Sequence, residues 1–407
     1  MPRNRLTIIF IIAFLNLVGF GIIIPILPYY AAEFGLNTAM IGVLIGVYPA
    51  AQLVSAPLLG RLSDRFGRRP LLMITVLINT TAFLVFALAT NATVLFISRI
   101  LAGLAMGNGS VLQAYVTDLT EGPERTYCLG RIGAALGLGF IVGPALGGLF
   151  SSSGYALPAF LAAFLSLLNL LAIYFWLPES LKAGERIQSA RLWSLHSMKN
   201  IFRQPLIANL LNTRFFFSLA FSTFTTIFAL YAQDILRLSS AQTGYILAYA
   251  GFLIILVQGV MVEQLVKHIN EGSLLFYSMV LMVLALIGWA FSDSVLKVML
   301  ALIPLSVASG VFRTVITSTL TRAGRPEEIG GILGLSLSAD SLTRVIAPSL
   351  GGILLASLGP AWPALSGAFL LLLIVPGAYK RYLKSDNPVF HTHCVKTENC
   401  PPMETEI

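Results

Sequence analysis

The chain has 407 residues, of which 57% are hydrophobic and only 11% are charged, and its mean hydropathy is +0.84. Soluble domains are about 45–50% apolar and about 25% charged, so this composition excludes an ordinary soluble protein. The apolar runs are long and unbroken, which also excludes a membrane β-barrel, whose strands alternate over about ten residues. A polytopic α-helical membrane protein is the class that remains.

Hydropathy predicts twelve membrane-spanning helices, divided six and six by the polar stretch 178–204. The fold class is therefore an all-α integral membrane protein of two six-helix bundles. We expect a first bundle over 1–178, a cytoplasmic linker over 179–206, a second bundle over 207–384, and a disordered cytoplasmic tail over 385–407. The predicted spans are 6–32, 39–59, 70–89, 93–117, 129–151, 155–177, 207–233, 240–262, 272–291, 295–320, 330–355 and 360–379.

The net charge of +8 is an orientation signal. With the N-terminus inside, the outer turns contain only Arg237 and Lys297, while the tails, the inner loops and their edges contain most other basic residues. The positive-inside rule then predicts that both termini are cytoplasmic, and no nucleic-acid partner is expected. Arg3 and Arg5 precede an apolar run too long for a signal peptide, so the first span is a signal anchor. A multi-pass protein of the cell membrane is the expected location.

The segment 60–69 packs four arginines and one aspartate into the turn between the second and third spans. A glycine at position 60 lets the second span approach a neighbour closely. Asp64 can face the positive N-terminal end of the eleventh span, near Gly330, and the arginines can pair with Asp118 or with lipid phosphates. We expect a gate built on a contact that forms and breaks, the alternative being arginines that only fix topology. The gating residues are Gly60, Asp64, Arg65, Gly67, Arg68, Arg69 and Asp118.

The charged segment resembles the loop between helices 2 and 3 of the major facilitator superfamily. Arg99-x3-Gly103-x3-Gly107 in the fourth span resembles a motif of that family linked to proton coupling, and an arginine reaching toward the surface is the alternative. The fifth span contains a glycine-rich run that resembles the helix-5 signature of drug/proton antiporters, although close helix packing alone would also use it. Its residues are Gly139, Gly143, Pro144, Gly147 and Gly148.

Among subfamilies, the stretch from Val18 to Ser180 resembles tetracycline/proton antiporters and their vertebrate tetracycline-transporter-like relatives. The resemblance implies a secondary transporter of the major facilitator type, with a central cavity lined by helices 1, 4, 7 and 10. Those antiporters carry aspartates in helices 1 and 3, where this chain has Asn16 and Ala82. Neither side chain can carry a proton, so the proton route of that subfamily is not available unchanged.

An internal repeat relates the two halves. Gly143-Pro144-Ala145-Leu146-Gly147-Gly148 matches Ala347-Pro348-Ser349-Leu350-Gly351-Gly352 at a shift of 204 residues, and Gly42 matches Gly244 at a shift of 202. Repeats of this kind build transporter halves related by an axis along the membrane normal.

Few charges lie inside the predicted spans. Asp340 lies about eleven residues into the eleventh span, about 16 Å along a helix and therefore near the midplane. Arg344 is one turn further and can pair with it, Arg313 lies in the tenth span, and Arg99 in the fourth. Intramembrane charges are functional by default, so Asp340 is the candidate proton carrier; a silent pair with Arg344 is the alternative.

The three arginines outnumber the one acid, which predicts a cavity that attracts anionic or zwitterionic solutes. Polar side chains on the four lining helices can add hydrogen bonds. The candidate cavity residues are Asn16, Arg99, Gln113, Thr226, Arg313, Thr317 and Arg344.

The function these features predict is export of small amphipathic organic molecules, drug-like or anionic, in exchange for protons. An organic-anion facilitator or uptake carrier without proton coupling is one alternative, and a non-transporting receptor or lipid scramblase is another. The expected partners are a small organic substrate, protons and membrane lipids, and the expected state is a monomer. No enzyme activity, cofactor or metal is expected, because no phosphate-binding glycine loop occurs and the tail from His391 to Cys400 lacks a common zinc spacing.

Overall fold

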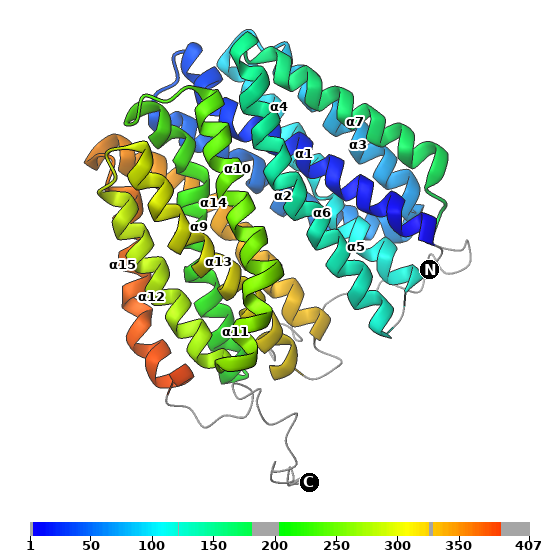
Figure 1. Ribbon diagram of the computed structural model, residues 1–407. Coiled ribbons are helices and arrows are strands. Elements are labelled where there is room, and N and C mark those ends of the chain that lie inside the picture. Colours follow the sequence, from blue (N-terminus) through cyan, green and yellow to red (C-terminus); the bar gives the residue numbers. More distant parts are fainter. Residues whose placement is uncertain (1–2, 121, 181–202, 325–328, 384–407) are drawn as a thin grey trace.

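The computed structural model describes residues 3–120, 122–180, 203–324 and 329–383 (Figure 1). The predicted disordered tail and most of the predicted linker lie outside the described residues. Within the described part, twelve helices are long and apolar enough to cross a membrane, in the order that hydropathy predicts.

Among the described residues, seven helices form the N-terminal half and seven more the C-terminal half, because two of the twelve spans consist of two helices each. The fourth span is α4 and α5, and the eighth is α10 and α11 joined by a π-helical turn over Val257–Met261. The helices are α1 (Arg3–Glu33), α2 (Thr38–Phe66), α3 (Arg68–Ala87), α4 (Ala92–Met106), α5 (Asn108–Leu119), α6 (Gly122–Phe150), α7 (Ala156–Trp176), α9 (Pro205–Asp234), α10 (Ser240–Leu256), α11 (Val262–His268), α12 (Glu271–Ala290), α13 (Val295–Ala323), α14 (Ile329–Leu358) and α15 (Trp362–Ala378).

Side-chain caps start four of the helices that follow turns predicted to be outside. Asn37 accepts from the Met40 amide at 2.9 Å, and Asn91 caps α4 in the same way. Ser239 begins α10 with a reciprocal capping box, and Ser294 caps α13. Such caps satisfy N–H groups that the first turn of a helix leaves free.

The charged segment is helical rather than a loop, which corrects the prediction from sequence. Helix α2 continues to Phe66 and α3 begins at Arg68, so Gly67 is the single residue between the two helices. Gly67 has a φ of +103°, a conformation that side chains with a Cβ rarely adopt. Its N–H donates to the Ser63 carbonyl and closes the last turn of α2.

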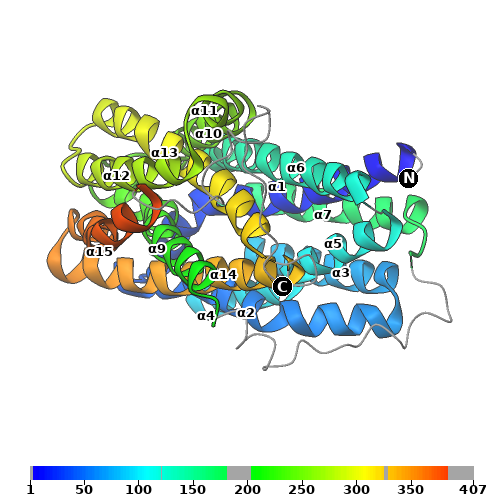
Figure 2. The ribbon, with the colours of Figure 1, turned by 90° about the horizontal axis from the view of Figure 1, so that it is seen from below.

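The two halves are separate bundles that lie side by side (Figures 1 and 2). The C-terminal bundle packs around Trp289 and the stacked rings of Phe217 and Phe312, whose centroids are 3.7 Å apart. The N-terminal bundle packs around Phe86 at one end and Tyr115 at the other. Each half therefore has its own core, and at the Phe86 end the core of the first half also includes Ile227, Leu230 and Leu355 of the second half.

Glycines bring the halves together at one end of the molecule. A Cβ on Gly148 of α6 would lie 3.2 Å from the Gly244 Cα of α10, and a Cβ on Gly42 of α2 would lie 3.0 Å from the Gly352 Cα of α14. These four glycines are the ones that the internal repeat pairs in sequence, so the repeat produces two equivalent crossings between the halves.

Candidate transport cavity

A cavity of about 590 Å³ lies between the two halves. Its walls come from α1, α2, α4, α5 and α6 of the first half and from α9, α10, α13 and α14 of the second. The charged residues in this lining are three arginines and one aspartate: Arg99, Arg313, Arg344 and Asp340.

Hydrogen bonds between the halves close one end of the cavity. The Tyr29 hydroxyl lies 2.7 Å from Thr243 Oγ1 and donates to the Leu238 carbonyl at 2.9 Å. Thr38 donates to Asp234 Oδ2 at 3.3 Å on the α2–α9 side. Next to Tyr29, burial raises the pKa of the Tyr155 phenol above its ordinary value, so that this ring stays neutral. The lining continues away from this end toward α5, the beginning of α6 and the π-helical turn, where the bundles diverge in Figure 1.

Asp340 forms a buried ion pair, but not with the partner expected from sequence. Its Oδ2 accepts from Arg214 Nη2 at 2.7 Å and its Oδ1 from Arg214 Nε at 3.3 Å, while Ser218 Oγ donates to Oδ1 at 2.7 Å. The predicted pairing with Arg344 is wrong in this structure, because the forked guanidinium of Arg214 on α9 reaches both carboxylate oxygens. Arg344 instead extends into the cavity and is exposed there.

Arg214 is the charged residue that sequence reasoning missed. It lies nine residues after the start of α9, about 14 Å along the helix axis. Its side chain is 7% exposed, and its Nη1 also donates to Thr317 Oγ1 at 3.0 Å. Its position well inside an apolar run was a signal available in the sequence. With Arg214 counted, the cavity and its wall contain four arginines and one aspartate.

The three arginines of the cavity lining form no ion pair with a carboxylate of the described residues. Arg313 on α13 is exposed to the cavity and acts electrostatically on Asp340. Arg344 has no ion-pair partner among the described residues. Arg99 is only 2% exposed; its guanidinium lies 4.7 Å above the Phe86 ring, and its Nη2 has no hydrogen-bond partner in the part of the chain that the structure describes.

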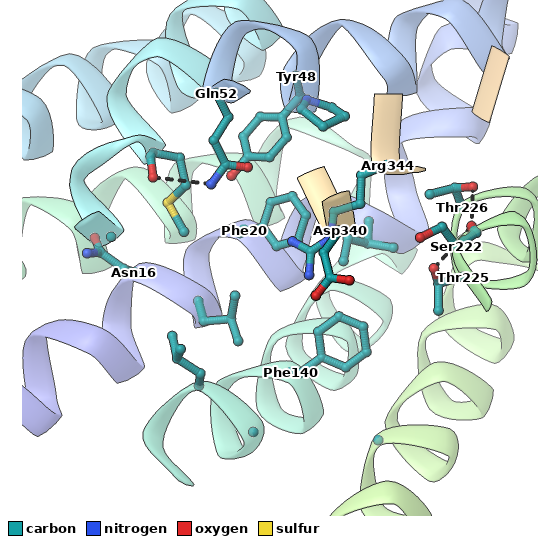
Figure 3. A pocket seen from close by; sticks show the side chains of 18 of the residues that line it. Asn16, Phe20, Tyr48, Gln52, Phe140, Ser222, Thr225, Thr226, Asp340 and Arg344 are labelled. Carbon is teal, nitrogen blue, oxygen red and sulfur yellow. Dashed lines mark hydrogen bonds between the residues drawn. The ribbon is translucent and has the colours of Figure 1, made fainter. Parts of the chain in front are cut away.

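The predicted polar residues occupy different places. Asn16, Gln113 and Thr226 line the cavity, whereas Thr317 accepts a hydrogen bond from the Arg214 side chain. Asn16 already accepts from Asn169 Nδ2 of α7 at 3.0 Å. Three aromatic side chains and one amide side chain at the centre of the cavity are not predicted from the sequence. Figure 3 shows them on the side facing Arg344 and Asp340. These residues are Phe20, Tyr48, Gln52 and Phe140.

In the charged segment, the interactions of Arg68 tie together three helices of the N-terminal half. Arg68 is 5% exposed and pairs with Asp64 at 2.6 Å and with Asp118 at 3.1 Å. Glu179 accepts from the backbone N–H groups of Arg68 and Arg69, and Arg65 lies over the neighbouring Phe66 ring. The ion pair of Asp64 thus lies within its own half. The side chains near Gly330, where a contact with the other half was expected, lie outside the described residues.

Two glycines of the gating set differ in what surrounds them. A Cβ on Gly60 would lie 3.9 Å from Ser110 Oγ, an ordinary contact, so the close helix approach expected at this glycine is not present. A Cβ on Gly67 would lie 2.5 Å from the Glu179 carboxylate. Gly67 therefore serves both the chain reversal and the approach of Glu179.

The C-terminal half repeats the buried ion pair of Arg68 and Asp118 with the charges exchanged. Glu271, at the start of α12, is 3% exposed, pairs with Arg322 and accepts from Thr319 Oγ1 at 2.8 Å. The shifts between the corresponding positions are 203 and 204 residues, within the range of 202 to 204 that the internal repeat shows.

The glycine-rich run of the fifth span has two packing faces in α6. Gly139, Gly143 and Gly147 face α1, where a Cβ on Gly143 would lie 2.7 Å from the Gly21 Cα. Pro144 packs against Gly21 as well, and Gly148 faces α10 of the other half. The run therefore joins α1 and α10 to one helix.

Two bundles of six spans around a cavity that is closed at one end and contains charged side chains have the architecture of an alternating-access membrane carrier. The sequence matches the profile of the Major Facilitator Superfamily over residues 9–334. Solute carrier family 22 member 18 of Mus musculus is 30% identical over 88% of this chain and 91% of its own length. Tetracycline resistance protein, class C, of Escherichia coli is 29% identical over 93% and 98%.

A solved structure shows the same fold. The human organic anion transporter MFSD10 (TETRAN) aligns with a TM-score of 0.70 at 23% identity, covering 93% of this chain and all of that one. The chain therefore belongs to the major facilitator superfamily. It is a multi-pass integral membrane protein and a secondary active transporter.

Proposed function

We propose that this transporter moves small amphipathic organic anions and couples their movement to protons through Asp340. The observation that carries the proposal is the charge of the site: three arginines and one aspartate line the cavity, and a fourth arginine holds the aspartate. Arginine donates in a fork that fits carboxylates, sulfonates and phosphates, so this wall is suited to anions. The aromatic rings of Phe20 and Phe140 supply the apolar part of the site.

Asp340 is the coupling residue in this proposal because its ion pair can be opened by a proton. Protonation neutralises the carboxylate, which removes its attraction for the Arg214 and Arg313 guanidiniums. Arg214 and Arg313 then become free to attract an anionic solute, so the proton state and the solute affinity are linked. Alternating access follows if the glycine crossings at the closed end separate while the other end closes.

The relatives support transport of organic molecules and leave the substrate open. One is by name a tetracycline resistance protein, and the solved structure is that of an organic anion transporter. We propose that a monomer carries out this transport across the cell membrane, with both termini in the cytoplasm and no enzymatic step.

The test is solute transport by purified protein in vesicles. Asp340→Asn should abolish uptake of 2-naphthalenesulfonate driven by a pH gradient and should leave binding of this permanently charged anion in place. The matched control is Asp293→Asn, an exposed acid at a predicted outer turn that pairs with Lys297. Wild-type uptake that ignores the pH gradient would instead identify an uncoupled facilitator, and absence of solute turnover would favour a receptor or scramblase.

A further inference from the structure

Arg99 is the least compensated charge of the cavity wall. It is 2% exposed, yet its contacts are the face of Phe86 and a long 3.4 Å hydrogen bond from Nε to Ser98 Oγ. Its Nη2 has no hydrogen-bond partner in the described part of the chain. Burial of an unpaired guanidinium costs free energy, and buried charges are ordinarily paired. A buried charge that lines a cavity and lacks a counter-ion is a vacant place for an anion.

Tyr48 connects Arg99 to the centre of the cavity. A close approach of α4 to α2 puts Gly103, one turn after Arg99, against the Tyr48 carbonyl. The Tyr48 ring stacks on Phe20 with centroids 4.9 Å apart, and both rings line the cavity. No hydrogen bond joins the Tyr48 hydroxyl to another described residue, so this donor is also available.

Arg344 extends into the same cavity from the other half. Figure 3 shows its side chain beside Phe20, the ring on which Tyr48 stacks. Arg313, by contrast, is partly balanced by Asp340. Arg99 and Arg344, which have no carboxylate partner among the described residues, thus come from opposite halves and line the same cavity as Tyr48.

We propose that Arg99, Tyr48 and Arg344 form a binding site for the anionic group of the solute, with Phe20 as the surface for an aromatic body. The solute class is an aryl monoanion, such as an aromatic sulfonate or carboxylate. This site rests on the proposed function and specifies its ligand. Because one arginine belongs to each half, the bound anion bridges the halves and stabilises the state in which they lie close together.

The experiment measures binding of three probes that share a naphthalene ring to the full-length protein in detergent by isothermal titration calorimetry. The probes are 2-naphthalenesulfonate, the neutral 2-naphthalenesulfonamide and the permanently cationic trimethyl(2-naphthyl)ammonium. Arg99→Met and Arg344→Gln should each weaken sulfonate binding about tenfold to hundredfold, the range for a hydrogen bond to a charged group. Neither change should alter sulfonamide binding more than about threefold.

Three further variants separate a binding role from a structural one. Tyr48→Phe keeps the stack on Phe20 and should weaken sulfonate binding about fivefold, the size of one hydrogen bond. Arg99→Met should melt at or above the wild-type temperature without ligand, because it removes an uncompensated buried charge. Arg203→Gln, an exposed arginine at the start of the C-terminal half, should bind all probes like the wild type.

The two proposals fail in different ways. If the wild type binds the sulfonate but Arg99→Met and Arg344→Gln bind it equally well, the bridging site is refuted and the anion cavity stands. A wild type that binds only the cationic probe refutes the anion cavity and the bridging site together. Loss of folding in Arg99→Met would show a structural arginine and also refute the site. If the losses of sulfonate binding free energy add in the Arg99–Arg344 double variant, the two arginines contact different groups of the solute, which would contradict a shared anion site.

Discussion

Asp340 and Arg214 are 126 residues apart in sequence, and each is less than a tenth exposed. Bringing both ions out of water is costly, and their attraction offsets that cost only while both are present. Removing one partner leaves the other charge buried without a counter-ion, whereas removing both leaves no charge at this position. The stability of the C-terminal bundle should therefore respond to the pair as a unit.

Arg214→Met and Asp340→Asn should each lower the free energy of unfolding by about 1–3 kcal/mol. This is less than the loss for an ion pair fully enclosed by protein, because Asp340 also lines the cavity. The double variant should recover at least half of the summed loss, since it leaves no unpaired charge. Thermal unfolding in detergent checks both expectations. Lys297→Met, which removes an exposed pair with Asp293, should leave the unfolding temperature at that of the wild type. Fully additive losses would contradict the idea of one coupled unit.

At this scale, the sequence identified which residues carry charge into the membrane better than it identified their partners. Helical spacing makes Arg344 a neighbour of Asp340, and this local rule gave the wrong pair. The observed pairing depends on how α9 and α14 pack, which no local pattern contains. The vacant environment of Arg99 and the position of Tyr48 depend on the same tertiary contacts.

Helices α6 and α14 carry the crossings between the halves at their glycines. The contact of Gly148 with Gly244 and that of Gly42 with Gly352 lie near the hydrogen bonds of Tyr29 and Thr38. Backbones that touch in this way can separate and rejoin without repacking long side chains. We infer that these crossings are the moving contacts at the closed end of the cavity.

Gly148→Val should prevent this closed end from forming, because a Cβ at that position would lie 2.8 Å from the Ala241 carbonyl oxygen. Transport should fall at least tenfold while the protein remains folded. A cysteine placed at Leu27, a buried cavity residue, should react faster in Gly148→Val than in the otherwise wild-type protein when an impermeant maleimide is applied at the closed end. The matched control is Gly288→Val on α12, where the nearest side-chain atom would be 3.9 Å away. Wild-type labelling and transport in Gly148→Val would argue against a moving contact.

Hydropathy predicted the number and order of the spans, because each must be apolar along its whole length. It did not predict the breaks within them. The helix of the fourth span is interrupted at Gly107, where a Cβ would clash with Ser55 and Ala56 of α2. The interruption therefore follows from the close approach of the neighbouring helix. The charged segment was expected to be a loop, but Gly67 alone is needed to reverse the chain, and Arg68 with its two aspartates holds the helix ends.

For the whole molecule, the charge of the solute sets the direction of coupling. A proton on Asp340 frees Arg214 and Arg313, so a proton and an anionic solute favour each other's binding and cross together. A cationic solute would compete with the proton for the carboxylate and would be exchanged for it. Exchange is the mode that the resemblance to drug/proton antiporters predicts, and the two modes can be distinguished in one preparation.

Vesicles containing the purified protein should accumulate 2-naphthalenesulfonate when the outside is acidic, and a gradient of one pH unit can support up to about tenfold accumulation at one proton per anion. This movement is electroneutral, so clamping the membrane potential with valinomycin and potassium should leave it unchanged, while a protonophore should abolish it. Trimethyl(2-naphthyl)ammonium, if it is carried, should accumulate only when the vesicle lumen is acidic. Asp340→Asn should remove the pH dependence for both probes, since the proton and the solute are linked only through this carboxylate. Accumulation of the sulfonate with an acidic lumen would show that anion and proton compete, and would place the proton elsewhere than on the partner of Arg214.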